Sequence, residues 1–103
     1  ETLIIWGGEF GRMPTNQGTA GRDHNPRGFS MFLAGGGTRG GTAYGATDEF
    51  GLRAAEEQIP IRNVHATILD LMGLEDEELR YLHAGRLRQL TDIGGEVLDE
   101  VIA

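Results

Sequence analysis

The fold of this chain is set by residues 2–8, which read Thr-Leu-Ile-Ile-Trp-Gly-Gly. A short β-prone run that stops at two glycines is typical of a buried strand, predicted here over residues 2–6. Residues 29–34 form a second run of this kind, again stopped by glycines. The connecting residues 7–28 are too rich in Gly and Pro for the helix that a parallel crossover usually contains. We therefore expect the two strands to pair antiparallel.

Reactive side chains are concentrated in the connecting segment. Glu9 and Arg12 closely follow the first strand, and Arg22, Asp23 and His24 precede the second. Antiparallel pairing would bring the end of one strand and the start of the other to the same sheet edge, so Glu9 and His24 would converge. Carboxylates and imidazoles are usual ligands of divalent metals, and arginine suits an anionic substrate. We take this segment as the candidate functional site.

Each of the metal-ligand candidates has two interpretations. Glu9 is a metal ligand or general base, or else a carboxylate that pairs with Arg12 or accepts N–H bonds from the loop. His24 can bind a metal through one ring nitrogen while the other nitrogen donates to Asp23. The alternative is a loop histidine hydrogen-bonded to the backbone. Position in the sequence leaves both interpretations open.

Three arginines lie beside these groups, Arg12, Arg22 and Arg27. Their guanidinium groups could clamp a phosphate or sulfate bidentately. In the alternative interpretation they only neutralise the acids Glu9 and Asp23. The sequence offers no further partner that decides between these roles.

A helix is predicted over residues 64–72, with Asn63 as its cap and Gly73 just beyond its end. The apolar stripe that predicts it consists of Val64, Ile68, Leu71 and Met72. Residues 81–90 predict a β-hairpin that turns at 83–86.

Weaker signals cover the other segments. A last helix is expected to start at Thr91 or Asp92, with apolar residues of 97–102 on one face. The acidic residues 75–78 predict a solvated turn or the first turn of a short helix. A short strand is expected near residues 43–44. Residues 35–40 match the pattern G-x-G-x-x-G, but no helix start follows, so we predict a loop and no nucleotide site.

The composition excludes several classes of protein. The chain has 103 residues and a formal net charge of −7, and it has no cysteine. This length suits one domain, and its acidic balance argues against nucleic acid or an anionic membrane as a partner. Without cysteine, disulfides and thiolate metal sites are excluded. No apolar run approaches the ~20 residues of a transmembrane helix, so we expect no membrane span.

An ordered set of stretches resembles one bacterial family, the domain-of-unknown-function family 1501 of the alkaline phosphatase and sulfatase superfamily. The stretches are residues 2–12 (TLIIWGGEFGR), 21–26 (GRDHNP), 33–37 (LAGGG), 45–49 (GATDE), 65–69 (HATIL) and 90–92 (LTD). Together they span nearly the whole chain.

The resemblance implies an α/β fold, a three-layer α/β/α sandwich with a mixed sheet that has one antiparallel strand. Superfamily enzymes usually hold two divalent metals, often zinc, calcium, magnesium or manganese, and act on sulfate or phosphate esters. By this resemblance Glu9 and His24 bind metal, Asp23 supports or joins them, and Arg12 and Arg22 steer an anionic ester substrate. A periplasmic or secreted location is implied in the same way.

The chain also departs from the superfamily pattern. Glu9-Phe10 stands where the superfamily has Asp-His, so at least one usual metal ligand is missing. The superfamily nucleophile would lie upstream of Glu1, which leaves the catalytic residues unknown. The sequence runs from Glu1 straight into a strand, without Met or a leader. We therefore expect residues 1–103 to be a single partial domain, the C-terminal portion of a larger protein.

Two functions follow from these expectations. The first is the C-terminal part of a metal-dependent hydrolase, inactive as a fragment. The second is a non-catalytic binding or structural protein that kept the fold. In isolation the fragment would expose sheet edges, which invite pairing, so self-association is expected.

Overall fold

The computed structural model describes residues 2–16, 18–91 and 94–103. Its elements are β1 (Leu3–Trp6), β2 (Gly11–Arg12), β3 (His24–Asn25), β4 (Phe32–Gly35), β5 (Ala46–Thr47), β6 (Ala54–Glu56), α1 (Ile61–Leu71), β7 (Arg80–His83), β8 (Arg86–Gln89) and the 3₁₀ turn η1 (Asp99–Val101). The strands of the described residues form four separate two-stranded antiparallel ribbons, β1–β4, β2–β3, β5–β6 and β7–β8. The fold is thus mixed α and β with one α-helix in the described part.

The β1–β4 ribbon confirms the predicted antiparallel pairing. Leu3 lies opposite Gly35 and Trp6 lies opposite Phe32. Strand β4 begins at Phe32, three residues later than expected, and residues 29–31 before it have no regular secondary structure. The short strand predicted near 43–44 lies slightly later, as β5, where it pairs with β6.

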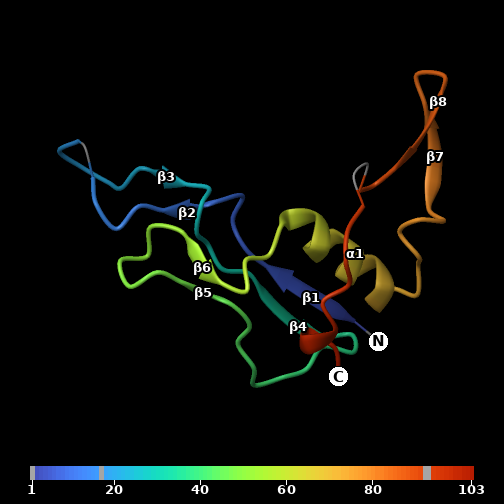
Figure 1. Cartoon of the computed structure of the whole chain (residues 1–103), viewed down its shortest axis with the longest axis horizontal. Coiled ribbons are helices and arrows are strands. Elements are labelled where there is room, and N and C mark those ends of the chain that lie inside the picture. Colours follow the sequence, from blue (N-terminus) through green and yellow to red (C-terminus); the bar gives the residue numbers. More distant parts are fainter. Residues whose placement is uncertain (1, 17, 92–93) are drawn as a thin grey trace.

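The strands of this ribbon are less buried than predicted. Alternation along β1 and β4 puts Ile4, Trp6 and Phe32 on one face, where they are 56%, 72% and 56% exposed. Leu3 and Leu33 point to the other face and are half-buried. Helix α1 overlies the ribbon in Figure 1, and Leu71 of the helix comes close to Gly37, just after β4. The face with Ile4, Trp6 and Phe32 is therefore the more exposed of the two, and Ile5 on the opposite face is 43% exposed.

Helix α1 begins earlier than predicted. Pro60 stands at its N-cap position, with the φ of −63° that proline prefers, and Asn63 lies inside the first turn instead of capping it. Met72 takes the C-cap position and Gly73 follows with a φ of +75°, as predicted for the end of the helix. The buried helix residues are Asn63, Ala66, Thr67 and Leu69, beside the predicted apolar stripe and not along it.

The C-terminal tail explains this shift of the buried face. The predicted last helix is wrong, because residues 94–98 have no regular secondary structure and η1 is the one helical turn of the described tail. Asn63 accepts a hydrogen bond from the Glu96 N–H at 3.2 Å, and Thr67 accepts one from the Leu98 N–H at 2.9 Å. The tail therefore runs along α1 and is held by two polar side chains one turn apart. Of the two predicted caps, Asp92 lies outside the described residues, and the buried Thr91 hydroxyl donates to Asp76.

Glycine is required where the tail crosses the helix. A Cβ at residue 95 would lie 2.6 Å from the Arg62 carbonyl oxygen and 3.0 Å from Ala66 Cβ. Only a residue without a side chain lets the backbone pass this close to α1.

The predicted hairpin is confirmed as β7–β8, with His83 opposite Arg86. Its turn residues Ala84 and Gly85 have φ values of +49° and +75°, as a two-residue hairpin turn of the primed type requires. The acidic residues 76–78 form a turn, one of the two expected outcomes. Residues 36–45 are a loop with no helix, as predicted for the glycine-rich pattern.

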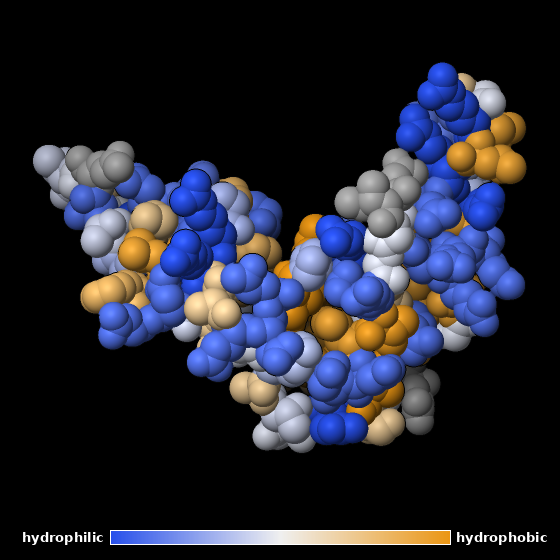
Figure 2. Space-filling view, in the orientation of Figure 1, coloured by the Kyte–Doolittle hydropathy of each residue, from blue (hydrophilic) through white to orange (hydrophobic). Residues whose placement is uncertain are grey.

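The molecule is open in shape. The hairpins β2–β3 and β5–β6 form one arm and β7–β8 the other, with β1, β4, α1 and η1 between them (Figure 1). The radius of gyration is 16.0 Å, whereas a compact domain of this length has about 13 Å. The accessible surface of 7862 Å² exceeds by about 2,000 Å² that of a compact monomer of this mass. Hydrophobic side chains gather on the surface between the arms (Figure 2).

The structure agrees with the expectation of no membrane span. Among the residues described, no helix combines the length and the apolar character needed to cross a bilayer.

The contact between the tail and α1 can be tested at Thr67. Replacing Thr67 with Val removes the acceptor of the Leu98 N–H, which we expect to lower the free energy of unfolding by about 1–2 kcal/mol. Hydrogen exchange of the Leu98 amide should become faster. Thr67→Ser keeps the hydroxyl and should preserve most of the protection. Unchanged Leu98 exchange in Thr67→Val would show that other contacts hold the tail.

The bare face of the β1–β4 ribbon generates a second prediction. We expect the 103-residue chain to self-associate through this face, because burying its apolar area is favourable. Sedimentation velocity should show oligomers for the wild type and a monomer for the Ile4→Lys, Trp6→Lys variant. The matched control is Leu82→Lys, Leu87→Lys, which changes two exposed apolar residues on the β7–β8 arm and should still associate. A wild-type chain that sediments as a clean monomer would contradict the prediction.

Candidate functional site

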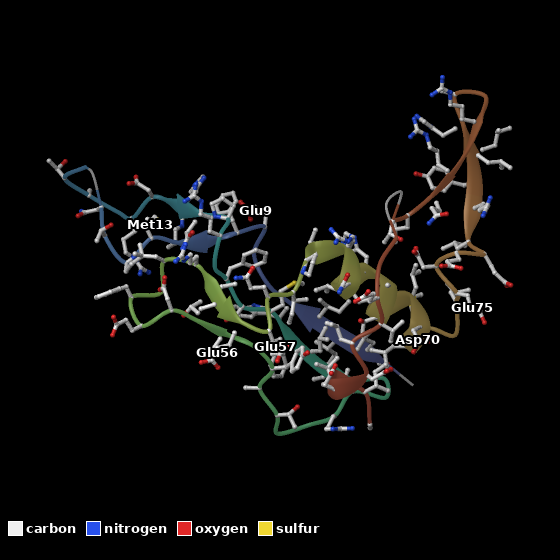
Figure 3. All side chains as sticks on the ribbon, viewed as in Figure 1. Glu9, Met13, Glu56, Glu57, Asp70 and Glu75 are labelled. Carbon is white, nitrogen blue, oxygen red and sulfur yellow. The ribbon has the colours of Figure 1, made fainter. Side chains whose placement is uncertain are left out.

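The β2–β3 hairpin brings together the two ends of the predicted site. Arg12 pairs with His24 and Gly11 with Asn25 across the hairpin. The Met13 N–H extends the pairing by donating to the Asp23 carbonyl at 2.8 Å. Glu9 lies two residues before β2, at the end of the hairpin that faces β1 (Figure 3). The sequence suggested that the β1–β4 ribbon would bring the two ends of the site together at its edge. In the structure a separate hairpin does so, through the pairing of Arg12 with His24.

Phe10 occupies the space next to the candidate imidazole. Its ring centroid lies 3.9 Å from that of His24, with the planes tilted by 31°. The guanidinium carbon of Arg12 lies 5.8 Å from the Phe10 ring centroid, within the range of a cation–π contact. Arg12 also donates to the Arg22 carbonyl at 3.1 Å. Arg12 is therefore engaged within its own hairpin.

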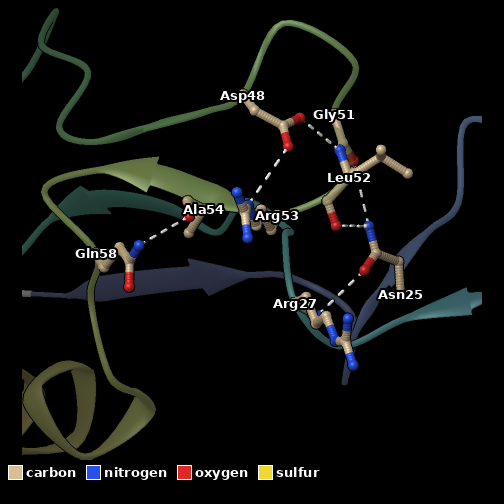
Figure 4. Close-up of polar contacts among 8 residues, drawn as sticks. All are labelled: Asn25, Arg27, Asp48, Gly51, Leu52, Arg53, Ala54 and Gln58. Atoms are coloured by element: carbon tan, nitrogen blue, oxygen red, sulfur yellow. Dashed lines mark hydrogen bonds and ion pairs between the residues drawn. The ribbon is translucent and has the colours of Figure 1, made fainter.

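A buried amide links this hairpin to the next one. Asn25 is 1% exposed, and its Nδ2 donates to the carbonyls of Gly51 at 3.2 Å and Leu52 at 3.1 Å (Figure 4). Its Oδ1 accepts the Arg27 N–H at 3.1 Å. One side chain thereby satisfies three backbone groups from segments about 25 residues apart and fixes their distance.

The loop between β5 and β6 is shaped by Asp48. Its Oδ1 accepts the Leu52 N–H at 2.8 Å, and its carbonyl accepts the Gly51 N–H at 3.0 Å. Arg53 closes the loop, since its carbonyl accepts the Asp48 N–H at 2.9 Å. The Arg53 Nε lies 3.9 Å from the second carboxylate oxygen of Asp48, which is a loose ion pair. The loop thus has a defined shape of its own before any ligand is considered.

A cavity of about 630 Å³ lies between the hairpin and this loop. His24 and Arg27 line it from the side of β3, and Asp48, Phe50 and Arg53 line it from the side of the loop. Its volume falls in the range of small-molecule sites. The lining combines one imidazole, two guanidinium groups and the two carboxylates of Asp48 and Glu49 with apolar surface. Its arginines and apolar side chains are the groups that could bind an anion with an apolar part.

The predicted site residues are distributed unevenly around this cavity. Of the five, His24 lines it, while Glu9, Arg12, Arg22 and Asp23 lie elsewhere on the hairpin. All five are exposed. Within the described ranges, no three His, Cys, Asp or Glu side chains are grouped so that they could hold a metal ion. Metal binding by Glu9, Asp23 and His24 therefore stays a prediction.

Sequence reasoning missed Asn25, Asp48 and Arg53. The spacing of Asp48 and Gly51 is a signal that could have located the loop, because Asp at the first position and Gly at the fourth position are typical of a type I turn. For Asn25 no local pattern exists, since its partners lie far along the chain.

Tyr44 lies outside the residues that line the cavity. Its hydroxyl donates to the Glu57 carboxylate at 3.2 Å. Partial burial, together with the nearby carboxylates of Glu100 and Glu57, raises the pKa of Tyr44. The hydroxyl therefore stays protonated and joins the loop before β5 to the end of β6.

Comparison with known proteins gives one match, to a protein family. The sequence model of a family described as "Protein of unknown function (DUF1501)" matches residues 1–102. The chain matches no curated protein and no solved structure. The family match therefore includes the hairpin, the loop and every residue that lines the cavity.

The importance of the Asn25 amide can be measured. Asn25→Ala leaves two carbonyls and one N–H without their partner, which we expect to lower the free energy of unfolding by about 2–3 kcal/mol. Asn25→Asp has the same shape but turns an oxygen toward the two carbonyls, so it should destabilise at least as much. Urea denaturation of both variants checks this. If Asn25→Asp were as stable as the wild type, the side chain would act by shape alone.

Proposed function

The chain belongs to the DUF1501 family of proteins of unknown function, and from this membership we propose that it forms the C-terminal part of a metal-dependent hydrolase of sulfate or phosphate esters. The proposal is carried by one observation, the cavity that His24, Arg27 and Arg53 line together. The resemblance of the ordered sequence stretches to the sulfatase-like superfamily supports the reaction class.

In this proposal residues 1–103 are one partial domain of a three-layer α/β/α sandwich. The support is the β1–β4 ribbon, whose face with Ile4, Trp6 and Phe32 has no covering layer in this chain. A ribbon with helix α1 over one face and apolar residues on the other matches the middle layer of such a sandwich. The surface excess of about 2,000 Å² over a compact monomer is consistent with a chain that packs against further parts of a larger domain.

The proposed metal ligands are Glu9 and His24, with Asp23 supporting or joining them. Carboxylate and imidazole are suitable donors for zinc, calcium, magnesium or manganese. The described residues of this chain do not form a complete metal site by themselves. The proposal therefore assigns the remaining ligands, and the nucleophile, to the upstream part of the protein.

Arg12 and Arg22 are proposed to steer the anionic ester toward the site. Both side chains are exposed on the hairpin that carries His24. Their positive charges would attract an anion from solution, an effect that weakens as salt is added. A periplasmic or secreted location is proposed from the family resemblance.

The rival proposal is a non-catalytic binding or structural protein that kept the fold. The contact between Phe10 and His24 favours it, because an aromatic ring stands where the superfamily has a second ligand and packs on the imidazole. Such a ring stabilises the hairpin and supplies no metal donor.

Metal content and hydrolysis of the full-length protein distinguish these proposals. We expect the wild type to bind a divalent metal and to hydrolyse an aryl sulfate or aryl phosphate, and the Glu9→Ala, His24→Ala variant to lose both properties. The matched control is Glu77→Ala, His83→Ala, which removes the same residue types from exposed positions in or next to the β7–β8 hairpin. Elemental analysis and ester assays with added metals are the measurements. Wild-type metal content in the Glu9→Ala, His24→Ala variant would rule the site out.

A further inference from the structure

Two arginines, Arg27 and Arg53, line the cavity from segments whose backbones touch. Arg27 is one of the three arginines expected from the sequence either to clamp an anion or to neutralise the acids, whereas Arg53 is not among them. The Arg27 carbonyl accepts the Ala54 N–H at 2.7 Å. A Cβ on Gly28 would lie 3.2 Å from the Arg53 Cα, which shows how closely the two backbones approach. Arg27 in the turn after β3 and Arg53 at the end of the loop before β6 therefore line the same cavity, with the buried Asn25 amide holding both segments in place.

Both guanidinium groups can bind an external anion. Among the described residues, none forms a hydrogen bond or ion pair with the Arg27 guanidinium. The Arg53 side chain is 75% exposed, and its 3.9 Å contact with Asp48 is long for an ion pair. Exposed pairs of this kind contribute little, so a ligand anion can compete for Arg53. Asp48 keeps its hydrogen bond to the Leu52 N–H in either case.

The cavity also presents apolar surface that lacks a partner. Phe50 is 65% exposed at its edge, and Met13 and Leu52 line it as well. An aromatic ring beside two arginines suits a ligand that has both an anionic group and an apolar, preferably aromatic, group. The carboxylates of Asp48 and Glu49 line the same cavity and oppose the anion, which limits the affinity.

We infer that Arg27 and Arg53 bind the anionic group of an aryl sulfate or aryl phosphate, while Phe50 packs against its aromatic ring. This inference rests on the proposed function and names its substrate class. The anion then lies beside His24, and the arginines act in binding and orienting the ester.

The test measures binding without metal, so that it does not depend on hydrolysis. Full-length protein in EDTA is titrated with phenyl phosphate, phenyl sulfate, inorganic phosphate and inorganic sulfate by calorimetry. We expect Arg27→Gln and Arg53→Gln each to weaken binding of all four probes about tenfold, the loss of one charge-assisted contact. Arg86→Gln makes the same charge change on the β7–β8 arm and should leave binding unchanged.

Two further variants separate the anionic and aromatic parts of the site. Phe50→Ala should weaken the binding of the two phenyl esters and leave the binding of the inorganic ions unchanged. Glu49→Gln should strengthen the binding of all four probes. The phosphate and sulfate probes together identify which ester the cavity prefers.

The outcomes separate this inference from the proposed function. Unchanged binding in Arg27→Gln and Arg53→Gln overturns the inference, whatever the hydrolysis assay gives. Equal weakening by Arg86→Gln also overturns it, since the effect would then come from net charge. Phenyl ester binding that depends on both arginines, in a protein without hydrolysis, supports the inference and refutes the hydrolase.

Discussion

The arrangement of the site depends on one buried carboxamide, that of Asn25. Two donated bonds and one accepted bond join β3, the turn after it and the loop between β5 and β6. A short two-residue strand pair such as β2–β3 has little stability of its own. With Asn25 in place, the hairpin and the loop become the two walls of one cavity, and His24 takes a fixed position beside Arg27.

The same principle recurs in the rest of the molecule. Among the described residues, the buried polar side chains are Asn25, Asn63, Thr67 and Thr91, whereas the buried apolar ones are Ala66 and Leu69. Side-chain hydrogen bonds to distant backbone therefore replace much of the apolar core that a domain of this size normally has. Apolar residues remain on the outside instead, above all on one face of β1–β4. Hydrogen bonds thus join distant segments of the chain, while an apolar surface stays exposed.

Local patterns predicted the local parts of this fold. The apolar runs located β1 and β4, the Gly and Pro content of 7–28 gave their antiparallel relation, and the turn at Ala84-Gly85 located β7–β8. Local patterns could not predict the path of the tail, the first residue of α1 or the cavity. The tail follows α1 because Asn63 and Thr67 accept hydrogen bonds from its N–H groups across about 30 residues. Hydrogen bonds between residues so far apart produce no periodic pattern in the sequence. For the same reason His24 could be selected as a site residue, but its neighbours across the cavity could not.

Residues 102–103 contact the loop that follows β4. Thr38 pairs with Ile102, and the Ala103 N–H donates to the Gly37 carbonyl at 2.8 Å. Contacts across more than 60 residues are slow to form, because a large loop must close first. During synthesis, the region around β4 therefore stays incomplete until Ile102 and Ala103 have also emerged from the ribosome. The order of translation thus separates the making of β4 from the completion of its contacts.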